Sequence, residues 1–373
     1  MKQKYIIPIF VPHLGCDHLC TFCNQRTISG SQSEVTPEDV EKTIDFYLEN
    51  FKEKDKDVEV AFFGGSFTGI PKEKQEELLK AANKYIKDKK VKSIRVSTRP
   101  DYIDREKLKL LKKYKVKTIE LGVQSANDYI LNRCKRGHTF KDVKKASRLI
   151  RWKGFTLGHQ MMVGLPESTK LDELNTAKDL AKLKPKIMRI YPVLVIKNTE
   201  LEKEYNEGIY EPLSVQQAVE RCKELCYFFE KKRIRVIRVG LQNTDTISDP
   251  NKNLSSEVVA GPYHETFRQL VESAMFYDMI VNKIKTYDVK VKEVEIRTNP
   301  QNVNNVVGYK RENIEKLKEF YNVDVKVKQD FNVKNEDIKI KVLKVYTDFL
   351  DDEEDVKNYF KHLYNIVKVF FYG

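Results

Sequence analysis

Three cysteines near the start of the chain, Cys16, Cys20 and Cys23, lie within eight residues of one another. Three thiolates do not complete the four-ligand shell of a structural zinc ion, so zinc would need His13 or His18 as a fourth ligand. The same thiolates can hold three corners of a 4Fe–4S cluster and leave its fourth iron open to a small molecule. The spacing therefore predicts a metal centre and favours an iron–sulfur cluster over zinc.

The segments that must position these cysteines alternate β-like runs with helical stretches over the first 240 residues. Such alternation predicts a parallel sheet built of βα units. Because six or seven units recur, we expect an α/β fold with a partial (β/α)6-type barrel, whose active site lies at the C-terminal ends of the strands. The expected strands are 5–12, 58–65, 93–100, 118–124, 156–166, 187–196 and 234–240.

Glycines and polar residues follow these runs, where the active site is expected. The loops after the strands carry Gly64, Gly65, Ser66, Ser97, Arg99, Glu120, Gln124, His138, Met162 and Gly164. Glycines let a ligand approach the backbone, and the polar side chains can reach hydroxyl or carboxylate groups. Each side chain also has a structural alternative, which is to satisfy a backbone group or to pair with a neighbouring charge.

The Cys-x3-Cys-x2-Cys loop after a first strand resembles the radical S-adenosylmethionine (SAM) superfamily of enzymes. The resemblance implies that Cys16, Cys20 and Cys23 hold a 4Fe–4S cluster that binds and reductively cleaves SAM. A 5′-deoxyadenosyl radical then takes a hydrogen atom from the substrate, and the electron comes from a donor such as flavodoxin or ferredoxin.

The same resemblance assigns roles to the residues at the strand ends. Gly64 and Gly65 would hold the SAM amino group, with Ser66 where the family often has Glu. Four further residues would contact SAM: Ser97, Glu120, Met162 and Gly164. Three would act as catalytic residues toward the substrate: Arg99, Gln124 and His138.

A series of motifs narrows the resemblance further. GGSFTGIP, STRPDY, ELGVQS, RGHT and MMVGLP occur in this order and resemble the radical SAM half of the elongator catalytic subunit family. Members of that family modify the wobble uridine of tRNA. We expect no acetyltransferase domain, because the residues after about 245 are too few for one. A compact bacterial group of elongator-like proteins, which share VPHLGCxHxCxFCNQ and VVAGPYHETF, is a closer resemblance.

The charge of the chain suits an anionic partner, because 68 Lys and Arg face 55 Asp and Glu, a net charge of +13. The basic residues are densest at 131–153 and 231–238. We expect these stretches to bind RNA, most of all tRNA, and the alternative is a solvated helix face. The residues expected to contact RNA are Lys135, Arg136, Lys141, Lys144, Lys145, Arg235 and Arg238.

The pattern predicts a barrel domain over 1–245, a linker loop and connecting helix over 246–280, and a smaller α+β domain over 281–373. In this last domain Gly308-Tyr-Lys-Arg311 resembles the GXXG loop of KH domains, which clamps a nucleic-acid backbone. Gly308, Lys310 and Arg311 would then contact RNA, although Arg311 replaces the second glycine. The alternative is a small domain for packing or dimerisation.

Two rival functions remain open from the sequence. One is a radical SAM enzyme on a small molecule, like the oxygen-independent coproporphyrinogen oxidases, which carry a further cysteine where Gln25 stands here. The other is a non-catalytic, cluster-containing protein that binds RNA or the ribosome. Cys134, Cys222 and Cys226 are expected to be buried thiols, with an auxiliary cluster as the alternative. Without a signal peptide or an apolar run of about 18 residues, we expect a cytoplasmic protein that does not contact membranes.

Overall fold

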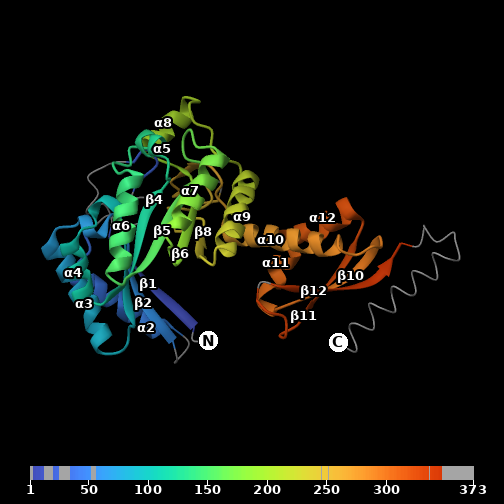
Figure 1. Ribbon diagram of the computed structural model, residues 1–373, viewed down its shortest axis with the longest axis horizontal. Coiled ribbons are helices and arrows are strands. Elements are labelled where there is room, and N and C mark those ends of the chain that lie inside the picture. Colours follow the sequence, from blue (N-terminus) through green and yellow to red (C-terminus); the bar gives the residue numbers. More distant parts are fainter. Residues whose placement is uncertain are drawn as a thin grey trace. The chain divides into compact units, whose positions relative to one another are not determined.

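The computed structural model describes residues 3–11, 20–24, 34–51, 56–244, 246–250, 252–335 and 337–346 (Figure 1). The chain divides into two compact units, Met1–Val271 and Glu272–Gly373. This division lies inside the 246–280 segment. Each unit has its own sheet and its own buried core.

The first unit is built on a seven-stranded parallel sheet whose strands are adjacent in chain order. This arrangement confirms the partial barrel expected from the alternating pattern, because every connection returns the chain to the same end of the sheet. The strands are β1 (Gln3–Val11), β2 (Lys56–Gly64), β3 (Ser93–Thr98), β4 (Val116–Gln124), β5 (Thr156–Val163), β6 (Ile187–Pro192) and β8 (Arg235–Val239).

Helices connect these strands and pack against the sheet (Figure 1). Capping boxes at Thr36, Thr139, Thr169 and Ser214 fix where four of them begin, by satisfying backbone N–H groups of the first turn. The helices are α2 (Pro37–Asn50), α3 (Lys72–Lys87), α4 (Arg105–Lys113), α5 (Asp128–Arg133), α6 (Phe140–Trp152), α7 (Lys170–Lys182), α8 (Glu200–Asn206) and α9 (Val215–Lys231).

The linker loop expected at the start of the 246–280 segment contains a short strand. β9 (Val258–Ala260) pairs antiparallel with β7 (Val195–Ile196) in a separate two-stranded sheet. Strands of two and three residues are too short to produce an alternating pattern, so only the pairing partner reveals them.

The second unit is a three-stranded sheet covered by helices, as expected for a smaller α+β domain. β10 (Val291–Thr298) lies between the parallel β11 (Asp324–Gln329) and the antiparallel β12 (Ile338–Val345). α11 (Val303–Val307) and α12 (Glu312–Tyr321) lie between β10 and β11 in the chain. The helix α10 (Phe267–Ile284) runs across the division between the two units.

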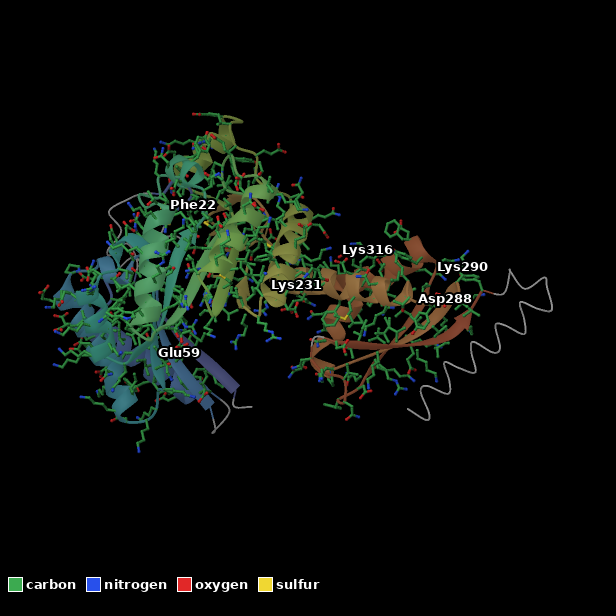
Figure 2. All side chains as sticks on the ribbon, viewed as in Figure 1. Phe22, Glu59, Lys231, Asp288, Lys290 and Lys316 are labelled. Carbon is green, nitrogen blue, oxygen red and sulfur yellow. The ribbon has the colours of Figure 1, made fainter. Side chains whose placement is uncertain are left out.

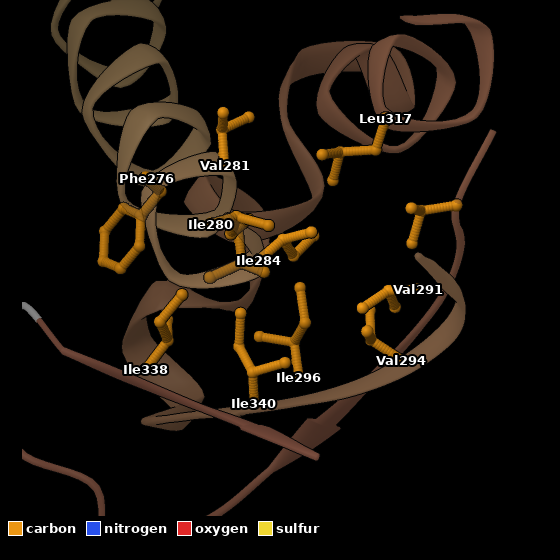
Figure 3. Close-up of a cluster of buried hydrophobic side chains, with 12 residues drawn as sticks. Phe276, Ile280, Val281, Ile284, Val291, Val294, Ile296, Leu317, Ile338 and Ile340 are labelled. Carbon is orange, nitrogen blue, oxygen red and sulfur yellow. The ribbon is translucent and has the colours of Figure 1, made fainter. Parts of the chain in front are cut away.

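Apolar side chains of α10, α12 and all three strands contribute to the core of the second unit. Figure 3 shows Ile280 and Ile284 of α10 facing Ile296 and Ile340 of the sheet, and all four are buried. Burial of such side chains stabilises the unit by roughly 1.5–3 kcal/mol each. The end of the expected domain over 281–373, from residue 347 on, lies outside the described residues. Within the described part, no helix is both long and apolar enough to cross a membrane.

Candidate active site

The loop that carries the cysteines is anchored by backbone hydrogen bonds from three directions. Cys23 N–H donates to the carbonyl of Cys20 (3.0 Å), and Thr21 N–H donates to the carbonyl of Cys134 (3.2 Å). Leu201 N–H of α8 donates to the carbonyl of Thr21 (2.9 Å). Cys20 is buried and Cys23 is partly exposed, while Cys16, His13, His18 and Gln25 lie outside the described residues.

Phe22 packs the loop onto the sheet end, and Figure 2 shows it near the end of the first unit at which α5 and α8 lie. It belongs to a buried cluster with Cys20, Ile130 and Cys134. The aromatic ring between Cys20 and Cys23 therefore fixes the position of both thiols relative to the strand ends.

Arg136 lies directly beside the cysteine loop. Its Nη1 donates to Cys20 Sγ (3.2 Å) and its Nη2 to the carbonyl of Gly122 (2.6 Å), with only 8% of the residue exposed. The structure thus buries a residue that we expected on an exposed RNA-binding surface. Among the described residues, no carboxylate pairs with this guanidinium and no acceptor meets its Nε. A buried guanidinium with an unused N–H donor can bind a carboxylate or phosphate group of a ligand.

Gly64, the last residue of β2, and Gly65, which follows it, allow that strand to end against β1. Gly64 has a φ of +103°, and a Cβ atom there would lie 2.8 Å from the carbonyl oxygen of Val11. Gly65 N–H donates to the same oxygen (3.0 Å). Only glycine permits this close backbone approach, so any side chain at residue 64 would push the two strand ends apart.

A cavity of about 920 Å³ opens along the inner face of the sheet. Its wall near the cysteines includes Phe22, Cys23, Gly64, Gln124 and Met162. Gln124 adopts a φ of +70°, and its buried Oε1 accepts no hydrogen bond from the described residues. A buried acceptor without a donor is costly unless a ligand or water supplies one, so Gln124 is suited to bind a hydroxyl or an N–H group.

Two residues expected at the site, Ser66 and Arg99, turn into the protein interior. Ser66 Oγ accepts the N–H of Arg99 (2.8 Å) and is 3.0 Å from Thr98 Oγ1. The Arg99 guanidinium donates to both carboxylate oxygens of Asp101, at 3.0 and 2.8 Å. Ser66 thus satisfies a backbone group and Arg99 pairs with a neighbouring charge, which is the structural alternative that the sequence left open for both side chains.

Gly164 also has both backbone groups engaged inside the protein. Its N–H donates to Glu173 Oε1 (2.8 Å), and its carbonyl accepts the Tyr210 hydroxyl (2.7 Å). Its φ of +81° gives the loop after β5 a turn that other residues rarely adopt. The residue therefore shapes this loop, and its expected contact with SAM stays a prediction.

His138 is buried, with 5% of the residue exposed. Burial, followed by the charge of Arg136, lowers the pKa of its imidazole to about 3. The ring is therefore neutral at physiological pH, so His138 contributes no positive charge to the site.

A row of polar side chains crosses the inner face of the sheet, one from each of the strands β2 to β6. Arg95 contacts Glu59 (Nε to Oε2, 2.9 Å) and Glu120, and Arg189 Nε lies 2.6 Å from Glu120 Oε2. Gln160 Nε2 donates to Ser97 Oγ and to Glu120 Oε2, both at 3.0 Å. Figure 2 shows that Glu59 lies far from Phe22 along the sheet.

Glu120, expected to contact SAM, is instead the centre of this row. Burial raises the pKa of its carboxyl, but Arg189 and Arg95 outweigh burial and hold the pKa below its usual value. Glu120 is thus a carboxylate fixed by two cations, with Ser97 linked to it through Gln160. Sequence reasoning missed Arg95, Gln160 and Arg189, because their partners come from distant strands.

The remaining basic residues differ in exposure. Lys141, Lys144 and Lys145 are exposed on α6, and exposed Lys135 pairs with Glu200 (2.6 Å). On β8, Arg235 is exposed, while Arg238 is half-buried, and both line the cavity. In the second unit, Lys310 and Arg311 are exposed in the turn after Gly308, and these three residues have φ values of +49°, +70° and +84° respectively.

The three other cysteines lie in the protein interior. Burial raises the pKa of the Cys134 thiol to about 12, and it also raises the pKa of Cys222 well above its usual value. Over the ranges that the structure describes, no group of three or more His, Cys, Asp and Glu side chains gathers as a metal site. Cys134, Cys222 and Cys226 are buried thiols in the core.

Comparisons with known proteins agree with this geometry. The model of the radical SAM superfamily matches residues 10–180, and that of the radical SAM C-terminal domain matches residues 185–277. An uncharacterized protein of Methanocaldococcus jannaschii is 33% identical over 242 residues, which are 61% of this chain and 72% of that protein. This chain belongs to the radical SAM superfamily. It is therefore an enzyme of the kind that uses a 4Fe–4S cluster and SAM.

The radical SAM chain also resembles elongator proteins. A tRNA uridine(34) acetyltransferase of Methanocaldococcus jannaschii is 35% identical over 128 residues, 34% of this chain and 24% of that protein. Human elongator complex protein 3 is 27% identical over 183 residues, 44% of this chain and 34% of that protein. The chain spans about a quarter to a third of these two relatives, so their whole activities do not follow from the match.

A solved structure shares the fold of this radical SAM chain. Elp3 of Methanocaldococcus infernus, with residues 1–46 deleted, superposes with a TM-score of 0.59 at 22% identity. The match covers 74% of this chain and 63% of that one. The elongator-like resemblance read from the ordered motifs is thus confirmed for the fold.

Proposed function

We propose that this radical SAM enzyme modifies RNA, with tRNA as the substrate class. The observation that carries the proposal is a cavity bounded by Cys23, Gly64 and Arg136 in a unit that also presents exposed lysines on α6. Relatives named for tRNA uridine add support, although each is matched over a part of its length.

The residues present fit the cluster and SAM. Cys20 and Cys23 offer soft thiol donors beside the cavity, and Cys16 would supply the third. Arg136 Nε, which no described residue accepts, suits the SAM carboxylate, and Gln124 Oε1, to which no described residue donates, suits a ribose hydroxyl. When bound, the cluster and SAM supply hydrogen-atom abstraction, started by an electron from a donor such as flavodoxin or ferredoxin.

The chain's own side chains would orient the ligands and keep water away from them. Phe22 and Met162 form an apolar wall beside Cys23, which favours exclusion of water from the reacting groups. Gly64 lines the cavity at the end of β2, where the SAM amino group would lie. Buried Glu120 holds Arg95 and Arg189, which line the cavity, in place and so keeps this part of the wall polar.

The RNA would meet the protein through positive surfaces outside the cavity. Lys141, Lys144 and Lys145 lie on the exposed face of α6, while the opposite face of that helix is buried. Lys310 and Arg311 provide a second positive turn in the other unit. Such surfaces bind a phosphate backbone through counterion release, without reading sequence.

The test begins with protein purified and reconstituted without oxygen. We expect SAM and dithionite to yield 5′-deoxyadenosine, and we expect the yield to rise when bulk tRNA is added. Cys23→Ala should abolish this product, whereas Cys226→Ala, which removes a core thiol, should keep it. A fully loaded cluster that yields no 5′-deoxyadenosine would contradict the enzymatic proposal.

A small-molecule substrate is the second candidate, because a cavity of about 920 Å³ is within the range that small ligands occupy. In that case 5′-deoxyadenosine forms at a rate that tRNA does not change, and tRNA binding is weak even at low salt. Nucleosides released from treated tRNA would then show no change of mass.

A further inference from the structure

The polar row on the inner face of the sheet continues onto the edge strand β8. Arg189 of β6 pairs in register with Arg238 of β8, just after an irregularity in the ladder between the two strands. The row therefore carries three arginines, Arg95, Arg189 and Arg238, against two carboxylates, Glu59 and Glu120. One positive charge is left over.

The contacts show which arginine carries the excess charge. Arg95 bridges Glu59 and Glu120, and Arg189 binds Glu120 while its guanidinium lies 4.8 Å from the centre of the Phe63 ring. Both carboxylates are thus occupied by Arg95 and Arg189. Arg238 is left with a single weak hydrogen bond, from its Nη2 to Gln242 Oε1 at 3.4 Å.

The surroundings of Arg238 add positive charge instead of neutralising it. Arg189 lies beside it on β6, and Arg268 of α10 reaches the same edge, where its Nη1 donates to the carbonyl of Ile237 (2.9 Å). No carboxylate of the described chain forms an ion pair with Arg238. A half-buried cation among like charges is unfavourable unless an anion joins it.

Arg238 lines the same cavity as the described part of the cysteine loop. Arg238 and Arg235 both belong to the lining of this cavity, together with Cys23 and Gly64. A single guanidinium satisfies the two oxygens of a carboxylate, whereas two guanidinium groups offer more donors than a carboxylate accepts. The donor set on β8 is therefore matched to a phosphate.

We infer that Arg238, assisted by Arg235, binds a phosphate of the substrate molecule in the cavity. The inference rests on the proposed function in one respect, namely that the phosphate belongs to the backbone of an RNA. A free nucleotide would offer the same chemistry, so the source of the phosphate is decided by experiment.

The test compares uridine 5′-monophosphate, uridine and bulk tRNA as probes of the full-length protein. Wild-type protein should bind the monophosphate about 10-fold more tightly than uridine, the size of a hydrogen bond to a charged group. Arg238→Gln should remove this preference, and Arg238→Lys should keep part of it. Lys87→Gln, which removes an exposed lysine at the end of α3, is the matched control and should not change it. Unfolding curves show whether each variant is folded.

The tRNA measurement separates the two sources of phosphate. If the phosphate is part of RNA, Arg238→Gln should reduce the slope of log affinity against log salt by about 0.7–0.9, one phosphate contact. If neither wild type nor any variant binds tRNA, but the preference for uridine 5′-monophosphate over uridine depends on Arg238, the RNA proposal fails and the phosphate site stands. Equal affinity of wild type for uridine and its monophosphate, no binding of any probe, or an unchanged preference in Arg238→Gln would overturn the inference.

Discussion

Arg136 illustrates how one side chain at the site combines packing with charge. Its guanidinium spans Cys20 Sγ and the carbonyl of Gly122, so it ties the cysteine loop to β4. A buried guanidinium needs hydrogen-bond acceptors, and the part of the chain that the structure describes supplies them only in part because it leaves Nε without a partner. A carboxylate of a ligand could supply the acceptor that this guanidinium lacks.

We expect Arg136→Gln to weaken SAM binding to the reconstituted protein roughly 10- to 100-fold, the range of a lost charge-assisted hydrogen bond. The SAM affinity of Arg136→Lys should lie between those of wild type and Arg136→Gln, because lysine keeps the positive charge but lacks the planar guanidinium group. Equilibrium dialysis with labelled SAM measures the affinity. Arg148→Gln, at an exposed position of α6, should leave it unchanged. Equal affinity in Arg136→Gln and wild type would show that the guanidinium only supports the loop.

At the scale of elements, α6 joins the interior of the sheet to the basic surface. Its Ser147 hydroxyl is 2.9 Å from Nε2 of His159 on β5, and both residues are buried. Burial lowers the pKa of His159 to about 3, so the ring stays neutral between the helix and the strand. The helix therefore holds its lysines in place through contacts that depend on an uncharged histidine.

This contact predicts a pH dependence of stability. In the unfolded chain histidine takes up a proton near pH 6.5, whereas folded His159 does so only near pH 3. Its contribution to stability is thus complete above pH 6.5 and is lost as the pH falls from 6.5 toward 3, by about 1.4 kcal/mol for each pH unit. Between pH 7 and pH 5 the free energy of unfolding should therefore fall by about 2 kcal/mol less in His159→Gln than in wild type.

Urea denaturation of wild type and His159→Gln at pH 7 and at pH 5 checks this expectation. Glutamine can keep a hydrogen bond to Ser147 and does not titrate, so it isolates the effect of the proton. The buried His138, whose pKa is also about 3, should show the same behaviour in its own Gln variant. Parallel pH profiles of the variant and wild type would contradict the neutral buried ring.

For the whole molecule, the net charge of +13 is divided among distinct surfaces. Some arginines neutralise carboxylates inside the sheet, as Arg95 and Arg189 do. Others are exposed on α6 or in the turn at Lys310 and Arg311. The exposed groups, together with the half-buried Arg238 at the cavity, are the ones available for an extended anionic partner.

We expect the triple variant Lys141→Gln, Lys144→Gln and Lys145→Gln to reduce the salt slope of tRNA binding by about 0.7–0.9 for each phosphate contact that is lost. A matched triple variant of exposed lysines on α3, at Lys72, Lys80 and Lys87, removes equal charge and should change the slope little. Gel-shift titrations between low and moderate salt give the slopes. Equal effects of both triple variants would show that binding follows net charge alone.

The KH-like turn is tested by the same measurement. Lys310→Gln with Arg311→Gln should reduce the slope further when combined with the α6 variant, provided that both units contact one RNA. An unchanged slope would assign the second unit to packing or dimerisation.

Much of the fold could be predicted from local pattern. Seven of the strands, the helices between them and the division into a barrel and a smaller domain follow from apolar periodicity, which each segment carries within itself. The cysteine triplet and the glycines after β2 were readable for the same reason, since their spacing already limits the chemistry. β9 could not be predicted, because a strand of three residues has no period, and the expected strand 187–196 is divided in the structure into β6 and β7.

The direction of each charged side chain depended on the assembled sheet. Arg136 lies in a basic stretch with Lys135 and Lys141, yet it alone among these three is buried at the cysteines. Glu120 meets Arg95 and Arg189 only because parallel pairing brings β3, β4 and β6 into register. Ion pairs between residues far apart in the chain leave no local trace, so their partners, and the excess charge at Arg238, become visible only in three dimensions.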